Sequence, residues 1–339
     1  REDFDGFWRG MRMRQPESWW RTHVDMERYF TYHAMSIAVA RYDQKLNHNY
    51  SLYRHPQRGW LPIPWDLDMC LWPARYDLSS FRWQTQLRYS VLTDASLNRE
   101  YRNRARELLD LLFTKDQIEA LVDELAAPLR QVDGGNFAEL DQFLWNYHPR
   151  AVPGHRGSYF QNPIRPRESA WPVKYDTNDI AGRIQYFKDY LTDTPTAAGN
   201  RAGKAYCGWG YRQLLADCDV PGLPETPEVT LLEALPDKLT FHCSKPGDAA
   251  SIALHEWRIA KVRLRHGNAP NLYEIEPASE WHTARGEYAG KLILPAWQLE
   301  PGQTYRIRSR FTNRDGIAGH WCAPVEIVAP EPDTSPYAA

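Results

Sequence analysis

The sequence predicts an α+β protein, in which a mainly helical segment with one short β-hairpin is followed by a C-terminal all-β sandwich. Three observations support this class. Apolar residues recur at helical spacing over the first two-thirds of the chain, whereas the last third alternates apolar and polar residues as strands do. A proline-rich segment separates the two patterns. The length of 339 residues suits two domains, because domains usually run to about 100–200 residues.

The composition limits the classes of function. With 42% hydrophobic and 25% charged residues, it is typical of a globular protein. The net charge of −2 argues against nucleic-acid binding, which needs a clustered basic excess. No apolar stretch reaches the roughly 20 residues that span a bilayer. The 14 Trp and 25 Pro, against only 20 Gly, indicate rigid loops rather than a glycine-rich nucleotide loop.

A helix followed by a hairpin is predicted near the N-terminus. Residues 25–39 carry apolar groups at helical spacing, and Asp25 is a plausible N-cap. Residues 49–54 then alternate, and a second apolar run covers 60–65 after a turn around Pro56 and Gly59. This pattern predicts a β-hairpin with a connection of four or five residues.

Further helices are expected after the hairpin. A long one begins near Ser96, and others cover about 178–191 and 211–216. The apolar stripe of the long helix consists of Leu97, Tyr101, Ala105, Leu108, Leu109 and Leu112. Its arginines are predicted to lie largely on the solvated side, namely Arg99, Arg102, Arg104 and Arg106.

The C-terminal third has the pattern of a β-sandwich. Residues 220–227 contain three prolines and predict a stiff interdomain linker. Within residues 305–311, Tyr305, Ile307 and Phe311 face one way and three arginines face the other, as in a half-buried antiparallel strand. The predicted strands are 238–243, 256–262, 291–294 and 304–311. The predicted domains are therefore residues 1–222 and 223–330, with a disordered tail over 331–339.

The five cysteines do not define a compartment. None forms a C-x-x-C pair, which excludes a zinc ribbon or a thioredoxin-like motif. Cys243 and Cys322 fall in the same region, and the sequence leaves open whether they pair or stay as buried thiols.

Candidate chemistry concentrates in residues 41–69. Asp43 follows the end of a predicted helix, Asn49 opens the hairpin, and Asp66 and Asp68 follow its second strand. Oxygen ligands of this kind suit Mg²⁺ or Mn²⁺ rather than zinc. Protein kinases place a catalytic Asp, a metal-binding Asn and a metal-binding Asp in this same order. From the residue types alone, helix-capping and turn roles for these side chains stay open.

The string HNYSLYRHPQRGWLPIPWDLDM at residues 48–69 closely resembles the signature of the CotH family of spore-coat-type atypical protein kinases. Residues 95–125 are similar to the helical segment that follows it in the family, and the resemblance covers roughly residues 17–220. It implies a mostly helical, kinase-like C-terminal lobe whose hairpin carries the metal site. It also implies that ATP and a divalent metal are used to phosphorylate Ser and Thr hydroxyls of a protein substrate.

The resemblance also assigns roles to individual residues. Asp43 corresponds to the catalytic aspartate, and Asp66 to the metal-binding aspartate. Asn49 resembles the catalytic-loop asparagine, and its choice over Asn47 rests on the His-Asn-Tyr match. Asn49 and Asp66 would thus hold both the nucleotide and its metal, with Asp68 as a further candidate metal ligand.

One departure from the kinase pattern concerns the N-terminal side. Kinases clamp the nucleotide with a lysine from a β-rich lobe, but no lysine precedes Lys45 in this sequence. We therefore expect this chain to be the C-terminal part of a longer kinase, incomplete and inactive alone. The alternative is a catalytically inactive pseudokinase that serves as a surface binding or adhesion module.

The C-terminal region resembles a fibronectin type III-like domain over about residues 225–330. The resemblance is carried by Leu299-x-Pro301-Gly302-x-x-Tyr305, by Asn313-x-Asp315-Gly316 and by Trp321. It implies that Tyr305 anchors the penultimate strand and that Trp257 lies in the core. Because such modules are commonest in secreted and surface proteins, an extracellular or cell-envelope location is expected.

Overall fold

The computed structural model describes residues 2–39, 50–65, 67, 70, 86–130, 180–192, 208–263, 272–273, 283–285 and 290–331. The chain is a mixed α and β protein with antiparallel sheets, and it divides into two compact units. The first unit comprises Arg1–Ala105 and Phe113–Asp217, and the second comprises Arg106–Leu112 and Cys218–Ala339. The long helix α6 (Ala95–Leu111) contributes residues to both units.

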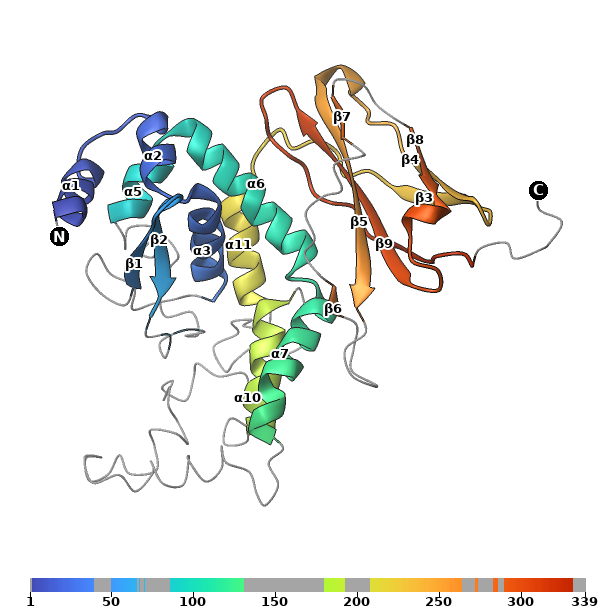
Figure 1. Ribbon diagram of the computed structural model, residues 1–339, viewed down its shortest axis with the longest axis horizontal. Helices are drawn as coiled ribbons and strands as arrows, with labels where there is room; N and C mark the ends of the chain where they lie inside the picture. The colour runs from blue at the N-terminus through green and yellow to red at the C-terminus, as the bar shows by residue number, and fades with distance from the viewer. Residues whose placement is uncertain are drawn as a thin grey trace. The chain divides into compact units, whose positions relative to one another are not determined.

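The described part of the first unit is helical apart from one hairpin (Figure 1). The predicted helix over 25–39 is confirmed as α3, and Asp25 caps it by accepting a hydrogen bond from the Arg28 amide at 3.2 Å. The predicted hairpin is confirmed as two antiparallel strands. The elements are α1 (Glu2–Met11), α2 (Glu17–His23), α3 (Met26–Ala38), β1 (Tyr50–His55), β2 (Gly59–Pro64), α5 (Gln86–Leu92), α6, α7 (Lys115–Arg130), α10 (Ile180–Leu191) and α11 (Trp209–Cys218).

Helix α6 confirms most of its predicted stripe but not the placement of its arginines. Leu97, Tyr101, Ala105, Leu108 and Leu109 are buried as expected. The prediction of a solvated side chain was wrong for Arg106, which is fully buried in the second unit. Its Nε donates to the Ala318 carbonyl at 2.8 Å, and its Nη1 donates to the Cys218 carbonyl. These two main-chain oxygens offset part of the cost of burying the guanidinium.

The described residues of the second unit form two antiparallel sheets, drawn mainly in orange and red in Figure 1. All four strands expected from the alternation are confirmed, as β4, β5, β8 and β9. One sheet has the order β3 (Val229–Ala234), β4 (Lys238–Cys243) and β8 (Lys291–Pro295). The other has the order β10 (Val325–Val328), β9 (Thr304–Asn313), β5 (Ile252–Arg263) and β6 (Leu272–Tyr273), with β7 (Thr283–Arg285) also paired to β5.

Both sheets contribute to one apolar core, as expected of a sandwich. Trp257 on β5 is 2% exposed and packs in a cluster with Phe241 of β4 and Ile307 of β9. The Tyr305 hydroxyl accepts a hydrogen bond from the Glu300 amide at 3.0 Å. This bond to the main chain a few residues upstream is that of a tyrosine corner, so the predicted anchoring role of Tyr305 is confirmed.

The two cysteines whose pairing the sequence left open are buried free thiols in this structure. Both contact Ser309. The Cys243 Sγ lies 3.7 Å from the Ser309 Oγ, and the Ser309 amide donates to the Cys322 Sγ at 3.1 Å. Burial raises the pKa of Cys243 to about 11 and also raises the pKa of Cys322. Both groups are therefore poor nucleophiles near neutral pH.

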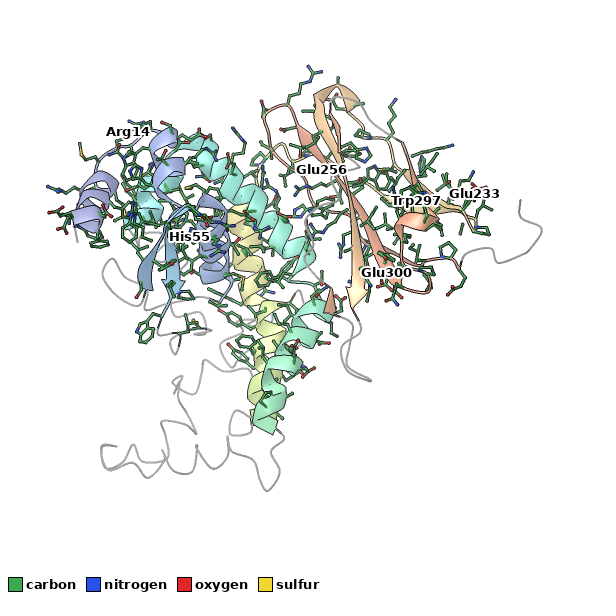
Figure 2. All side chains as sticks on the ribbon, in the orientation of Figure 1. Arg14, His55, Glu233, Glu256, Trp297 and Glu300 are labelled. Carbon is green, nitrogen blue, oxygen red and sulfur yellow. The ribbon has the colours of Figure 1, made fainter. Side chains whose placement is uncertain are left out.

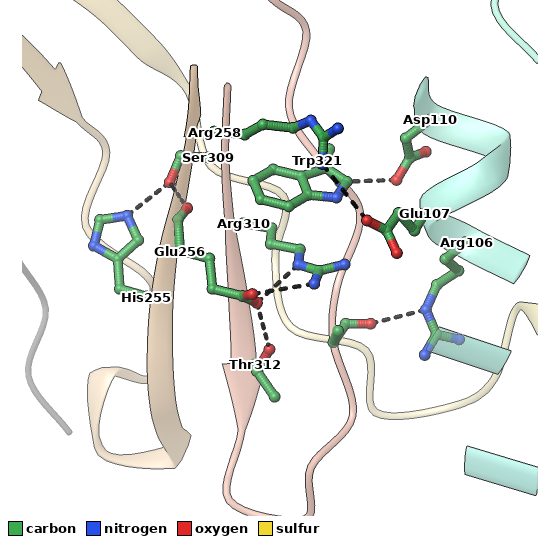
Figure 3. A network of polar contacts seen from close by, with 11 residues as sticks. Arg106, Glu107, Asp110, His255, Glu256, Arg258, Ser309, Arg310, Thr312 and Trp321 are labelled. Atoms are coloured by element: carbon green, nitrogen blue, oxygen red, sulfur yellow. Dashed lines mark hydrogen bonds and ion pairs between the residues drawn. The ribbon is translucent and has the colours of Figure 1, made fainter. Parts of the chain in front are cut away.

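A network of polar side chains lies on the sheet that contains β5 and β9 (Figure 3). Arg310 donates to the Glu256 carboxylate at 2.8 and 3.1 Å, and its guanidinium lies 4.4 Å from the ring centre of Trp321. Asp110 accepts from the Trp321 amide at 2.8 Å. Arg308 donates to the Cys322 carbonyl at 2.8 Å and is only 8% exposed. The face of β9 that carries these arginines is thus largely paired and covered rather than open to solvent.

The stability of the protein is expected to fall in acid because of His255. This residue is fully buried, and its Nε2 lies 2.7 Å from the Ser309 Oγ. The Ser309 hydroxyl donates its one proton to the Glu256 carbonyl, so His255 is the donor in the bond to Ser309. Burial lowers the pKa of His255 from 6.5 to about 4. The unfolded chain therefore binds a proton at a pH where the folded chain does not, so the stability present above about pH 6.5 is progressively lost toward pH 4.

Urea unfolding at a series of pH values between 7 and 4 measures this loss. Other groups also titrate in this range, so the control is His255→Gln, which keeps a donor toward Ser309 but has no titratable ring. The variant should lose less stability than the wild type over the same interval. Equal losses would assign the acid sensitivity to other groups.

Candidate active site

The closed end of the hairpin is fixed to the junction between α2 and α3. Val24 pairs with Trp60 in a short bridge, and the Asp25 amide donates to the Trp60 carbonyl at 3.0 Å. The Trp60 ring packs on Phe4 and Phe7, with ring centres 5.7 and 5.3 Å apart. Since α3 also packs against β2, the helix and the strand start from the same anchored point.

Gly59 makes this anchoring possible. Its φ is +82°, and a Cβ at this position would lie 2.5 Å from the His23 carbonyl oxygen and 3.0 Å from the Val24 amide nitrogen. Both contacts are to main chain, which cannot move aside as the end of a side chain would. Only glycine therefore allows the turn to approach the end of α2 so closely.

The variant Gly59→Ala is expected to lower the free energy of unfolding by about 1–3 kcal/mol, because it combines a left-handed backbone with a main-chain clash. Urea unfolding measures the loss. Gly6→Ala in α1 is the matched control, since a Cβ there meets nothing within 4 Å, and it should be neutral or slightly stabilising. A Gly59 variant as stable as the Gly6 variant would show that the close approach does not matter.

The open end of the hairpin is where the predicted site residues attach. Tyr50 pairs with Pro64, so β1 begins and β2 ends at the same level. Trp65 and Leu67 beyond β2 are 68% and 49% exposed. Asp43, Asn49, Asp66 and Asp68 all lie outside the described residues, so their mutual geometry stays a prediction. Figure 2 shows the hairpin with His55, the last residue of β1, labelled near the opposite, anchored end.

Within the described ranges, no three His, Cys, Asp or Glu side chains gather in a way that could hold a metal ion. The four candidates are not among these residues. Their donor chemistry can still be compared with that of the expected ion. Carboxylate and amide oxygens fit Mg²⁺ and Mn²⁺, which take oxygen ligands.

A partly buried polar cluster in the first unit was not predicted from the sequence. Arg88 of α5 donates from Nε to the Nε2 of His33 in α3 at 2.7 Å. Tyr101 of α6 donates to the Oδ2 of Asp217 in α11 at 2.5 Å. The four residues come from four helices far apart in the sequence, so no local spacing could reveal them. The one available signal was a polar residue, His33, within the apolar stripe of α3.

The comparison with family models decides the membership of the chain. Residues 4–191 match the model described as CotH kinase protein. The chain belongs to the CotH kinase family. The matched range contains the hairpin and the positions of all four candidate residues. Membership supports, in general terms, a kinase-like phosphotransferase function with use of ATP and a divalent metal, and it implies a protein substrate.

Solved structures similar to this CotH-family chain match about a third of it. A myokine structure is 16% identical, covers 32% of this chain and 99% of its own, and has a TM-score of 0.24. The twitchin kinase region from C. elegans is 19% identical over 32% of this chain and 17% of its own, with a TM-score of 0.23. The fibronectin type-III domain of human fibronectin type III domain containing protein 3 is 17% identical over 36% of this chain and 95% of its own, with a TM-score of 0.22.

No curated protein is similar enough to this CotH-family chain to count as a match. The family membership therefore rests on the family model alone. Among the helices that the structure describes, none has the length and apolarity needed to cross a membrane.

Proposed function

We propose that this CotH-family chain transfers the γ-phosphate of ATP to Ser and Thr hydroxyls of a protein substrate in a metal-dependent reaction. The observation that carries the proposal is the order Asp43, Asn49, Asp66 within the family-matched residues 4–191. Protein kinases have the same order of catalytic Asp, metal-binding Asn and metal-binding Asp.

The hairpin and helix α3, which the structure describes, support this proposal because the candidate residues lie next to them in the sequence. Asn49 directly precedes Tyr50, and Asp66 lies two positions after Pro64, the strand partner of Tyr50. Asp43 lies five positions after Ala38, the last residue of α3, which packs against β2. In the sequence, Asn49 and Asp66 therefore lie next to the open ends of β1 and β2, and Asp43 follows α3, which begins at the same anchored point as β2.

In the proposed reaction, Asp43 orients the acceptor hydroxyl and accepts its proton as the hydroxyl oxygen bonds to the γ-phosphorus. The bond between this phosphorus and the β–γ bridging oxygen breaks, and ADP leaves with that oxygen. Asn49 and Asp66 would hold Mg²⁺ or Mn²⁺, with Asp68 as a further ligand. When bound, this ion neutralises charge on the phosphate oxygens.

The alternative is a catalytically inactive pseudokinase that acts as a surface binding or adhesion module. Kinases use a lysine to hold the nucleotide phosphates, and residues 1–44 contain none, so this part of the chain does not supply that group. For either function we propose an extracellular or cell-envelope location. The support is the sandwich with its tyrosine corner, an architecture shared by many cell-surface domains.

Transfer of radiolabelled phosphate from ATP to casein, a protein rich in acceptor serines, tests the proposal. We expect transfer by the full-length native protein in Mg²⁺ and none in excess chelator. The variant Asp66→Asn should need about 10- to 100-fold more Mg²⁺ for the same rate, because one charged oxygen ligand is lost. Asp5→Asn, which removes an exposed carboxylate from α1, is the matched control and should behave as the wild type. Absence of transfer from the wild type would favour the binding module.

A further inference from the structure

A pocket of about 240 Å³ lies in the first unit, lined by residues of α5, α6 and α11. It is smaller than the roughly 300–1,000 Å³ of pockets for drug-sized ligands, so it suits a small ligand or one group of a larger one. No residue of the hairpin lines it. The charged lining residues are Arg88, Arg102 and Asp217, and polar ones include Tyr89, Asn98 and Tyr101.

Arg88 is held at the pocket by a neutral partner. Its guanidinium can only donate, so the Nε2 of His33 at 2.7 Å is the acceptor and carries no proton. Burial, together with the charge of Arg88, lowers the pKa of His33 to about 3. At neutral pH, His33 is therefore uncharged, and its hydrogen bond helps to fix the position of the Arg88 guanidinium.

A second hydrogen bond fixes two other lining residues, Tyr101 and Asp217. Asp217 is 8% exposed and Tyr101 is 1% exposed, and the Tyr101 hydroxyl donates to the Asp217 Oδ2 at 2.5 Å. This carboxylate adds one negative charge to the two positive charges of the arginines. The charged groups of the described lining thus favour a ligand with negative charge.

Arg102 is the second cationic group, one position after Tyr101 on α6. It is partly exposed and, among the described residues, forms neither a hydrogen bond nor an ion pair. Other arginines nearby differ in this respect. Arg104 donates to the Thr31 hydroxyl at 3.0 Å, and Arg21 pairs with Glu17 at 2.7 Å. The guanidinium of Arg102 therefore keeps its donors for a ligand in the pocket.

We propose that this pocket binds a small ligand through an oxyanion held by Arg88 and Arg102. Guanidinium groups match carboxylate and phosphate oxygens in geometry and make strong charge-assisted hydrogen bonds with them. The partly buried setting strengthens the attraction relative to an arginine in open solvent. Carboxylates and phosphate monoesters share this chemistry, and the experiment distinguishes them. The site is independent of the proposed phosphoryl transfer, since it uses none of the motif residues.

Isothermal titration of the full chain at constant ionic strength tests the site, with inorganic phosphate, O-phospho-L-serine and succinate as probes. We expect saturable binding of at least one probe. Binding of the first two assigns a phosphate ester, and binding of succinate alone assigns a carboxylate. Arg102→Gln should weaken the binding about 10- to 100-fold, the effect of losing charge-assisted hydrogen bonds. Its side chain has no partner to lose among the described residues, so the fold should be retained.

Two further variants make the result specific. Arg99→Gln removes a partly exposed arginine of the same helix that does not line the pocket, and it should leave binding unchanged. Asp217→Asn keeps an acceptor for Tyr101 but removes the negative charge, so it should strengthen binding. The proposal is overturned if no probe binds saturably. It is also overturned if Arg102→Gln binds as well as the wild type, or if Arg99→Gln weakens binding equally.

Discussion

Replacement of Asp43 by asparagine is expected to reduce the rate of phosphoryl transfer about 10²- to 10⁴-fold, the usual contribution of a positioned general base. Asparagine has nearly the same shape and can still accept a hydrogen bond from the acceptor hydroxyl. It cannot take up the proton at neutral pH. The loss should therefore fall on kcat, with little change in KM for ATP, because Asp43 is not proposed to touch the nucleotide.

Steady-state transfer from radiolabelled ATP to casein measures this effect. A loss confined to KM would assign Asp43 to nucleotide binding rather than to the acceptor hydroxyl. A variant that keeps the wild-type kcat would contradict the catalytic role. The circular dichroism of the variant should match that of the wild type, which separates a lost base from a lost fold.

The second large effect concerns the core of the sandwich. Trp257→Ala is expected to lower the free energy of unfolding by about 3–5 kcal/mol, the usual cost of truncating a buried aromatic side chain. Trp257 is 2% exposed and lies in the cluster to which both sheets contribute. Its truncation leaves a cavity that close-packed neighbours such as Phe241 and Ile307 can fill only in part.

Urea unfolding followed by far-UV circular dichroism measures this loss. The matched control is Trp297→Ala in the short helix η3 (Ala296–Gln298), where the ring is 80% exposed (Figure 2). Substitutions at exposed positions of this kind usually change the free energy of unfolding by less than about 0.5 kcal/mol. Similar losses for the two tryptophans would contradict the placement of Trp257 in the core.

The elements predicted correctly from the sequence are those whose signal is local. The 3.6-residue spacing and the N-cap Asp25 predicted α3, and alternation predicted β4 and β9. Strands β3 and β10 were missed for a physical reason. Five of the six residues of the edge strand β3 are exposed, so it shows no alternation of buried and exposed positions, and β10 alternates over only four residues, a run too short to stand out in the sequence.

Partners distant in the sequence explain the wrong placement of Arg106 and the missed polar cluster of His33, Arg88, Tyr101 and Asp217. Arg106 has the spacing of a solvated helix residue, yet its acceptor on Ala318 lies 212 positions away. His33 and Arg88 are 55 positions apart, and Tyr101 and Asp217 are 116 apart. Such pairs depend on how the helices pack, and helical periodicity within one segment carries no information about it.

The candidate site itself is indicated by an ordered motif rather than by geometry. The string from His48 to Met69 is specific enough to indicate the CotH family, and the family model confirms that assignment over residues 4–191. The roles of Asp43, Asn49, Asp66 and Asp68 stay predictions. The structure adds the anchored hairpin and the helix α3, from whose ends these residues continue.

The most direct test of the proposed site is the binding of Mn²⁺ in the presence of ATP, followed by the loss of the free-ion signal in electron paramagnetic resonance. We predict that the full-length native protein binds Mn²⁺ saturably and only when ATP is present, and that Asn49→Ala and Asp66→Ala each weaken this binding at least about 10-fold. Asp5→Ala should leave it unchanged. ATP-dependent binding that survives in both site variants, or no ATP-dependent binding by the wild type, would contradict a metal–nucleotide site at the open end of the hairpin.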